Sequence, residues 1–242
     1  MEVLNDILGY KNRKIFQDND CFSFSLDSVM LANFATIRLR DKLIVDLGCG
    51  NGVIPLILSL RTDKKIFGVE IQKKMANMAN KSIDINGLSD QIEIVNMNMK
   101  DFSNGNFFES FDLITCNPPY FKVNDKNYFN DSYEKMIARH EIEINLSDLL
   151  VCAKKLLKNN GNFAIVHRPE RLMEILFEFR KNSIEPKRIQ FVHEKNSKGS
   201  TLVLIEGQKN GNVGLKIENP IVMYNEDGSM TEEYALMQVE VR

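Results

Sequence analysis

The sequence contains no tryptophan, only three histidines and only four cysteines among its 242 residues. The histidines are dispersed along the chain, and the cysteines form no Cys-x-x-Cys pair; they are Cys21, Cys49, Cys116 and Cys152. This usage predicts reduced thiols in a cytoplasmic protein, without a disulfide framework and without zinc. We therefore expect no metal site.

The chain also lacks long apolar runs and a strong charge of either sign. No run approaches the ~20 residues of a membrane-spanning helix, and residues 1–6 lack the basic-then-apolar order of a signal peptide. The formal net charge is −2, and 43% of the residues are hydrophobic. We expect a globular cytoplasmic α/β protein that does not bind membranes and has no global attraction to nucleic acid.

A glycine-rich turn follows the first strongly apolar segment. Leu43–Leu47 predicts a buried strand, Gly48–Gly52 forms the turn, and a helix is predicted from Val53 to Leu60. Glycines let the backbone approach a ligand closely, and a helix start offers free N–H groups. The order of strand, glycine turn and helix therefore predicts a nucleotide-cofactor loop.

The details of this turn argue against a nicotinamide dinucleotide. The third glycine of the dinucleotide fingerprint is absent, because Val53 occupies its place. Asp46 stands two residues before the first glycine. A carboxylate there repels a pyrophosphate but accepts hydrogen bonds from an ammonium group. The turn therefore favours a nucleoside that carries an amino acid.

Acidic residues also follow the next two predicted strands. Glu70 ends the strand Lys65–Val69, close to the ~20-residue spacing at which an acid binds ribose hydroxyls. Asp101 is expected in the loop after the strand Ile92–Val95, where its carboxylate can accept the amine of an adenine. The predicted cofactor-binding residues are Asp46, Gly48, Gly50, Gly52, Glu70, Asp101 and the adjoining Phe102.

The quartet Asn117-Pro118-Pro119-Tyr120 follows the strand Phe111–Cys116. Two prolines cannot donate ladder hydrogen bonds, so the strand must stop at Asn117. The Asn117 amide oxygen and the Pro118 carbonyl are two acceptors that suit a planar –NH2 group, and Tyr120 can stack on its plane. We predict that these three residues are catalytic. The alternative is a proline-stiffened turn without a chemical role.

Basic and aromatic residues alternate in residues 121–140, the least regular long stretch. Such a mixture can grip phosphates and stack bases, although nearby acids nearly cancel the lysines. The predicted substrate-binding residues are Pro119, Phe121, Lys122, Arg139 and His140.

Both ends of the chain give shorter signals. In residues 22–26, apolar side chains alternate with serines, which is typical of a strand. Asp27 or Ser28 can then cap a helix that extends to Ala35. This opening either covers an edge of the sheet or closes over a cofactor. Near the other end, Ser229 and Glu232 have the spacing of a capping box before a short helix.

Five strand–helix alternations precede two strands, Arg188–Val192 and Thr201–Glu206, that are expected to pair as an antiparallel hairpin. This order predicts an α/β fold with a doubly wound sheet and one reversed strand near its edge. We expect one domain over residues 1–242, with an N-terminal extension (1–41), a core (42–208) and a C-terminal strand and helix (209–242).

The acids and glycines at the strand ends, together with the Asn-Pro-Pro-Tyr quartet, resemble the S-adenosylmethionine-dependent methyltransferases that modify amino groups. The resemblance implies a Rossmann-like class I fold with a seven-stranded sheet. Three further segments, residues 22–32, 138–141 and 220–224, resemble the bacterial tRNA1(Val) (adenine(37)-N6)-methyltransferases. That family implies S-adenosylmethionine as cofactor, a single-stranded tRNA loop as partner, and adenine N6 as the methylated atom. We expect a monomer.

Two other functions remain open from the sequence. The quartet fits any planar amine, so guanine N2 in rRNA or glutamine N5 in a protein is an alternative target. A nicotinamide oxidoreductase or a non-catalytic nucleotide-binding module is an alternative of a different class, which Asp46 and the missing glycine argue against.

Overall fold

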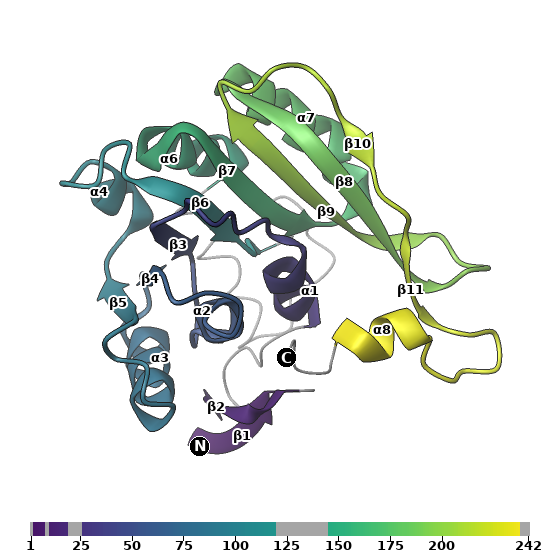
Figure 1. The fold of residues 1–242 in the computed structure, drawn as a ribbon, viewed down its shortest axis with the longest axis horizontal. Helices are drawn as coiled ribbons and strands as arrows, with labels where there is room; N and C mark the ends of the chain where they lie inside the picture. Colours follow the sequence, from purple (N-terminus) through teal and green to yellow (C-terminus); the bar gives the residue numbers. More distant parts are fainter. Residues whose placement is uncertain (1, 8–9, 19–25, 120–144, 238–242) are drawn as a thin grey trace, which may run out of the picture.

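A mixed β-sheet forms the centre of the structure, a computed structural model that describes residues 2–7, 10–18, 26–119 and 145–237. Its main strands lie in the order β5-β4-β3-β6-β7-β9-β8, and β9 is antiparallel to both of its neighbours (Figure 1). The bounds are β3 (Leu43–Leu47), β4 (Lys65–Glu70), β5 (Ile92–Asn96), β6 (Phe111–Cys116), β7 (Leu157–His167), β8 (Ile184–Lys195) and β9 (Ser200–Lys209). The predicted mainly parallel sheet with one reversed strand in a hairpin is confirmed, whereas the sheet of the described residues has nine strands and not the seven that were predicted.

Two short strands extend this sheet beyond the prediction. β10 (Lys216–Ile217) and β11 (Ile221–Tyr224) both pair with β8 in parallel. β8 and β9 are also longer than the segments predicted from the sequence. The helix α8 (Glu232–Met237) packs on β11, where the rings of Tyr224 and Tyr234 meet edge to face at 5.8 Å.

Side chains alternate along the strands between two apolar cores, as expected for a sheet that is covered on both faces. In β3, Ile44 belongs to one core and Val45 to the other. The first core includes α1 (Leu26–Phe34) and α2 (Val53–Leu58); the second includes α4 (Met99–Ser103), α6 (Leu146–Leu156) and part of α7 (Leu172–Lys181). Figure 1 shows α1 and α2 on one side of the sheet, and α6 and α7 on the other.

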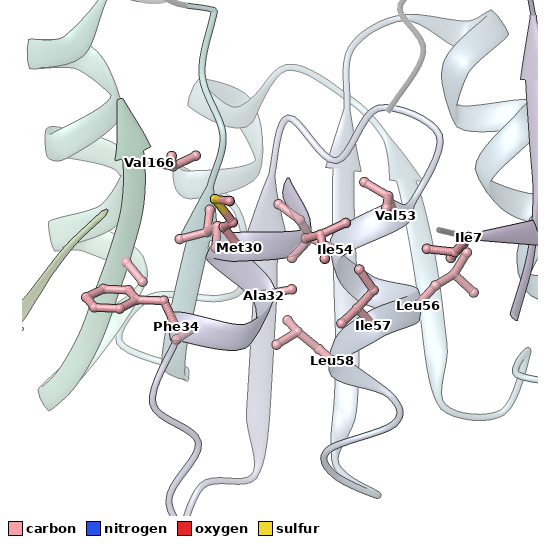
Figure 2. Close-up of a cluster of buried hydrophobic side chains, with 14 of the residues drawn as sticks. Ile7, Met30, Ala32, Phe34, Val53, Ile54, Leu56, Ile57, Leu58 and Val166 are labelled. Carbon is pink, nitrogen blue, oxygen red and sulfur yellow. The ribbon is translucent and has the colours of Figure 1, made fainter. Parts of the chain in front are cut away.

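The helices α1 and α2 pack directly against each other. Figure 2 shows Met30 and Ala32 of α1 among the side chains of Ile54 and Ile57 of α2. Each of these four side chains is at most 3% exposed. This packing gives α1 a fixed position relative to the strand β3 and the turn that follows it.

The sequence did not predict the N-terminal hairpin of β1 (Glu2–Ile7) and β2 (Tyr10–Asp18). Most of β1 is exposed, so the segment has no clear apolar face that would identify a strand. The hairpin packs on α3 (Lys73–Ile85), where Phe16 lies against Met75 and Met78, and polar contacts add to this packing. The Phe16 amide donates to Ser82 Oγ at 2.9 Å, and Asn51 Nδ2 donates to the Phe16 carbonyl at 3.1 Å.

Three local predictions are wrong. The helix expected from Arg168 begins as a 3₁₀ turn, Pro169–Arg171, before α7. The capping box at Ser229 is not formed, because its hydroxyl donates to Asp227 Oδ1 at 2.6 Å, while Thr231 Oγ1 accepts from the Tyr234 amide. Neither Asp27 nor Ser28 caps α1, since the helix already begins at Leu26. Within the described part of the chain, no helix is long and apolar enough to cross a membrane.

Candidate active site

The glycine turn and the Asn117 corner lie at the same edge of the sheet. β3 pairs in parallel with β4 on one side and with β6 on the other, so the carboxyl ends of the three strands are neighbours. Asp46 lies opposite Thr115 of β6 in this register. Open α/β sheets bind ligands at the carboxyl ends of their strands.

The three glycines of the turn adopt backbone conformations that favour glycine. Their φ angles are +73° at Gly48, +57° at Gly50 and +90° at Gly52. A Cβ on residue 52 would also lie 3.3 Å from Ala79 Cβ, whereas no described atom lies within 4 Å of where a Cβ on residue 48 would point. The turn therefore packs closely on α3 at one end and leaves space beside Gly48 at the other.

Glu70 connects this turn to the start of α3. Its side chain is buried, and its two carboxylate oxygens accept from the Gly50 amide at 2.9 Å and from the Gln72 amide at 2.8 Å. Each carboxylate oxygen has a second lone-pair site, so these two bonds leave capacity for further donors. Asn96 at the end of β5 adds a bond to the Glu70 carbonyl at 2.8 Å.

Asp46 is buried without full hydrogen bonding. Its Oδ1 accepts from Thr115 Oγ1 at 2.7 Å, whereas Oδ2 is buried and has no hydrogen-bond partner among the described residues. Burial raises the pKa of Asp46 from 3.8 to about 8; the bond from Thr115 lowers it, and the negative charge of Glu70 raises it. A buried polar atom without a partner is costly. A cationic donor at Oδ2 would remove this cost.

Asn117 follows the last residue of β6, as predicted from the prolines behind it. Its Nδ2 donates to Ser28 Oγ on α1 at 2.9 Å. Asn117, Pro118 and Pro119 are half-buried. The predicted site residues Tyr120, Phe121, Lys122, Arg139 and His140 lie outside the described residues, as do Phe22, Ser23, Phe24 and Ser25 of the opening segment.

Asp101 does not lie in a loop, contrary to the prediction. It belongs to the first turn of α4, and its side chain is exposed. Asn98 caps this helix by accepting from the Lys100 amide at 2.9 Å. Phe102 is buried in the core, where its ring stacks on Phe107 with centroids 5.0 Å apart.

Sequence reasoning missed Thr115 and Ser28 as parts of this edge. Thr115 is a polar residue between Ile114 and Cys116 in a mostly apolar strand, which is a signal that the sequence offers, and the structure buries it fully. Ser28 had no such signal, because its contact with Asn117 spans 89 residues of chain.

The cysteines at this edge are not suited to nucleophilic chemistry. Burial raises the pKa of the Cys49 and Cys116 thiols, and the charges of Glu70 and Asp46 raise them further. Both therefore stay protonated, whereas the reactive form of cysteine is the thiolate. The described residues contain no group of three or more metal-ligating side chains.

This combination of fold and strand-end residues occurs in a known family. The family model of the methyltransferase small domain matches residues 25–183 of the chain. The chain belongs to this family. It is a methyltransferase, and the matched segment includes the glycine turn and the Asn117 corner.

Curated relatives extend the similarity over most of the chain. A tRNA1(Val) (adenine(37)-N6)-methyltransferase of Actinobacillus pleuropneumoniae is 26% identical over 93% of this chain and 93% of its own length. A protein of the same name from Bacteroides thetaiotaomicron is 30% identical over 68% of this chain and 67% of its own length. These matches confirm the resemblance to this group of methyltransferases.

Solved structures support the fold alone. A predicted O-methyltransferase from Agrobacterium tumefaciens has a TM-score of 0.70 at 19% identity, covering 88% of this chain and 97% of its own. A geranyl diphosphate C-methyltransferase from Streptomyces coelicolor, solved with S-adenosyl-L-homocysteine, has a TM-score of 0.55 at 15% identity, covering 75% and 74%. The class I methyltransferase fold expected from the sequence is thus confirmed.

Proposed function

We propose that this methyltransferase transfers a methyl group from S-adenosylmethionine to N6 of an adenine in RNA, with adenosine 37 in the anticodon loop of tRNA1(Val) as its target. The observation that carries the proposal is the adjacency of two strand ends. β3 leads into the glycine turn and β6 leads into Asn117, and the two strands pair directly. A donor bound at the turn and an amine bound at Asn117 would therefore be neighbours.

The residues of the turn fit an amino-acid-bearing nucleoside. Asp46 takes the ammonium group through Oδ2, the buried atom for which the described residues supply no partner. Glu70 takes the ribose hydroxyls, Asp101 and the main chain of Phe102 bind at the adenine, and Gly48, Gly50 and Gly52 let the backbone approach. When bound, S-adenosylmethionine supplies a methyl group that its sulfonium already activates.

The Asn117 corner orients the amine. Asn117 Oδ1 and the Pro118 carbonyl each accept a hydrogen bond from one N–H group of this amine. They thereby favour the tetrahedral, nucleophilic form of the nitrogen in the transition state. Tyr120 stacks on the base. Because a paired base is inaccessible, the target must lie in a single-stranded loop or be unstacked.

The choice of tRNA is supported by the names of the relatives and by residues of the irregular stretch. We assign the contacts with RNA to Pro119, Phe121, Lys122, Arg139 and His140. Guanine N2 and glutamine N5 remain the alternative acceptors, since each presents a planar amine to the same two carbonyl oxygens. We further propose that the enzyme acts in the cytoplasm as a monomer.

Methyl transfer to defined acceptors tests the proposal. The purified protein is incubated with radiolabelled S-adenosylmethionine and an unmodified tRNA1(Val) transcript, a transcript with guanosine in place of adenosine 37, or a release factor. We expect label only in the first, recovered as N6-methyladenosine in nucleoside mass spectrometry. Label in the release factor, or recovered as N2-methylguanosine, would replace adenine by one of the alternatives.

A ligand screen separates the enzyme from the other class of function. Thermal unfolding is measured with S-adenosylhomocysteine and with NADH. Stabilisation by S-adenosylhomocysteine alone is expected, because Asp46 disfavours a pyrophosphate beside the turn. Stabilisation by NADH alone would contradict the cofactor assignment.

A further inference from the structure

The side chain of Asn117 is held by a residue from a distant element. Asn117 Nδ2 donates to Ser28 Oγ at 2.9 Å, and the Ser28 side chain lies in the first turn of α1. Ser28 is only 6% exposed. The acceptor end of this hydrogen bond is therefore shielded from water, while Asn117 itself is half-buried.

Ser28 belongs to a helix that is fixed on several sides. The next residues, Val29 to Ala32, are each at most 1% exposed, and Figure 2 shows Met30 and Ala32 of this helix packed against α2. Asn33 Nδ2 donates to the Tyr10 hydroxyl at 2.8 Å. Directly after the helix, the Thr36 amide donates to Glu206 Oε2 at 2.7 Å. The hydroxyl of Ser28 is thus a fixed point of contact for Asn117 at the end of β6.

The direction of the bond determines which end of the Asn117 amide can act as an acceptor. An asparagine side chain carries one carbonyl oxygen and one NH2 group on opposite sides. With Nδ2 donating to Ser28, Oδ1 is turned to the other side. In an amide rotated by half a turn the Ser28 hydroxyl could donate to Oδ1, but NH2 would then face the target amine and two donors would meet, so the orientation with Nδ2 on Ser28 is the productive one.

We infer that Ser28 is a positioning residue, which anchors the amide of Asn117 through Nδ2 while Oδ1 faces the amine to be methylated. This inference rests on the proposed function, in which Asn117 Oδ1 accepts from that amine. It assigns Ser28 no contact with the cofactor or the RNA. Loss of its hydroxyl therefore lowers kcat and leaves the binding of both ligands unchanged.

Three variants test this role in the complete protein. Ser28→Ala removes the hydroxyl, Ser28→Thr keeps it, and Ser59→Ala is the control. Ser59 follows α2 and its Oγ donates to the Leu56 carbonyl, so the control removes a helical serine hydroxyl away from the Asn117 corner. We expect kcat to fall about 10-fold in Ser28→Ala, less than the ~100-fold cost of removing a group that touches the reacting atoms. KM for tRNA and Kd for S-adenosylhomocysteine should stay within about two-fold of wild type.

The conservative variant and the control sharpen the result. Ser28→Thr should recover most of the lost kcat, and Ser59→Ala should keep wild-type kcat. If the role of Ser28 were purely structural, Ser28→Ala would instead lower the midpoint of thermal unfolding and raise both KM for tRNA and Kd for S-adenosylhomocysteine. Wild-type kcat in Ser28→Ala would overturn the inference, as would parallel losses of binding and rate.

A second readout needs neither cofactor nor RNA. The side-chain amide signals of Asn117 in a ¹⁵N-correlated NMR spectrum are assigned by their disappearance in Asn117→Asp. They should shift in Ser28→Ala and stay in place in Ser59→Ala. Unmoved signals in Ser28→Ala would overturn the contact itself. If the signals shift in Ser28→Ala but the wild-type protein methylates no RNA, the contact between Ser28 and Asn117 stands and the proposed function is refuted.

Discussion

Two aspartates on paired strands experience opposite environments. Asp112 near the start of β6 has three donors on Oδ2: the Lys42 amide at 2.9 Å, the Leu43 amide at 3.1 Å and Lys158 Nζ at 2.8 Å. Asp46 near the end of β3 has one described donor, Thr115, and an oxygen with none. Burial raises the pKa of both, but at Asp112 the hydrogen bonds outweigh it and the pKa falls below 3.8, whereas at Asp46 it rises to about 8.

This difference indicates that the two ends of the sheet have different roles, stability at the amino end and ligand binding at the carboxyl end. At the amino end of the strands the carboxylate stabilises the folded chain by joining β6 to the start of β3. At the carboxyl end the folded chain tolerates a carboxylate that it does not itself satisfy. Unsatisfied groups are typical of binding sites, where a ligand provides the missing partner. Variants at the carboxyl end should therefore lower activity or ligand affinity without a matching loss of stability, and variants at the amino end should lower stability.

The largest expected effect is on catalysis at the carboxyl end. Asn117→Ala removes the acceptor for the target amine and should lower kcat by about 100-fold or more. Affinity for S-adenosylhomocysteine, measured by calorimetry, should stay nearly unchanged, and the free energy of unfolding should fall only by the roughly 1 kcal/mol of the lost hydrogen bond to Ser28. Full methylation activity in this variant would refute the role of Asn117.

Asp46→Asn should separate ligand binding from stability. It removes the carboxylate proposed to hold the ammonium, so affinity for S-adenosylhomocysteine should fall by about 10- to 100-fold, the range of a charged hydrogen bond. The wild-type affinity should also rise with pH towards about 8, because Asp46 must lose its proton to bind a cation. That rise should be absent in the variant.

The same substitution should make the ligand-free protein relatively more stable as pH rises. A raised pKa in the folded state favours folding at low pH, and this advantage is lost as pH increases from 3.8 to about 8. Asn carries no such penalty, so the stability of the variant relative to wild type should increase by at least about 1 kcal/mol between about pH 5 and about pH 7. Urea unfolding at both pH values measures this change in relative stability. A stability difference between variant and wild type that does not depend on pH would contradict the raised pKa of Asp46.

Asp112→Ala is the counterpart at the amino end. It leaves the Lys42 and Leu43 amides without their acceptor, so the free energy of unfolding should fall by roughly 1 to 3 kcal/mol at neutral pH. Because the pKa of Asp112 is lowered, this loss should shrink as pH falls below 3.8, the opposite of the trend at Asp46. Affinity for S-adenosylhomocysteine should not change. A clear loss of this affinity would contradict the assignment of stability to the amino end and ligand binding to the carboxyl end.

Local signals in the sequence were enough to predict most of the carboxyl end. The end of β6 at Cys116 followed from the prolines behind Asn117, and the glycine turn followed from the spacing of its glycines. Each signal depends on backbone rules that act within a few residues. The contact between Ser28 and Asn117 could not be predicted in this way, because it depends on how α1 packs on the sheet.

The misplacement of Asp101 has a different cause, since the sequence did contain the relevant signal. Asn98 caps α4 and Asp101 stands three residues later, the spacing of an N-cap and an acid in the first helical turn. The apolar pattern of a five-residue helix is too short to identify it. The N-terminal hairpin was missed for a related reason, because β1 is exposed over most of its length and shows little alternation.

The position of Asp101 leads to the smallest expected effect. As an acceptor for the adenine amine, its loss in Asp101→Ala should weaken S-adenosylhomocysteine binding by about 2- to 10-fold, the range of one hydrogen bond. The chain offers a comparison in α6, where Asn145 is the N-cap and Asp148 stands in the first turn; Asp148 also pairs with Lys100 Nζ of α4 at 2.7 Å, so its loss perturbs the start of α4 without removing Asp101. Asp148→Ala should cost a similar amount of helix stability without weakening the ligand. Equal affinities in the two variants would mean that Asp101 only stabilises the start of α4, and the adenine would then need another acceptor at the end of β5.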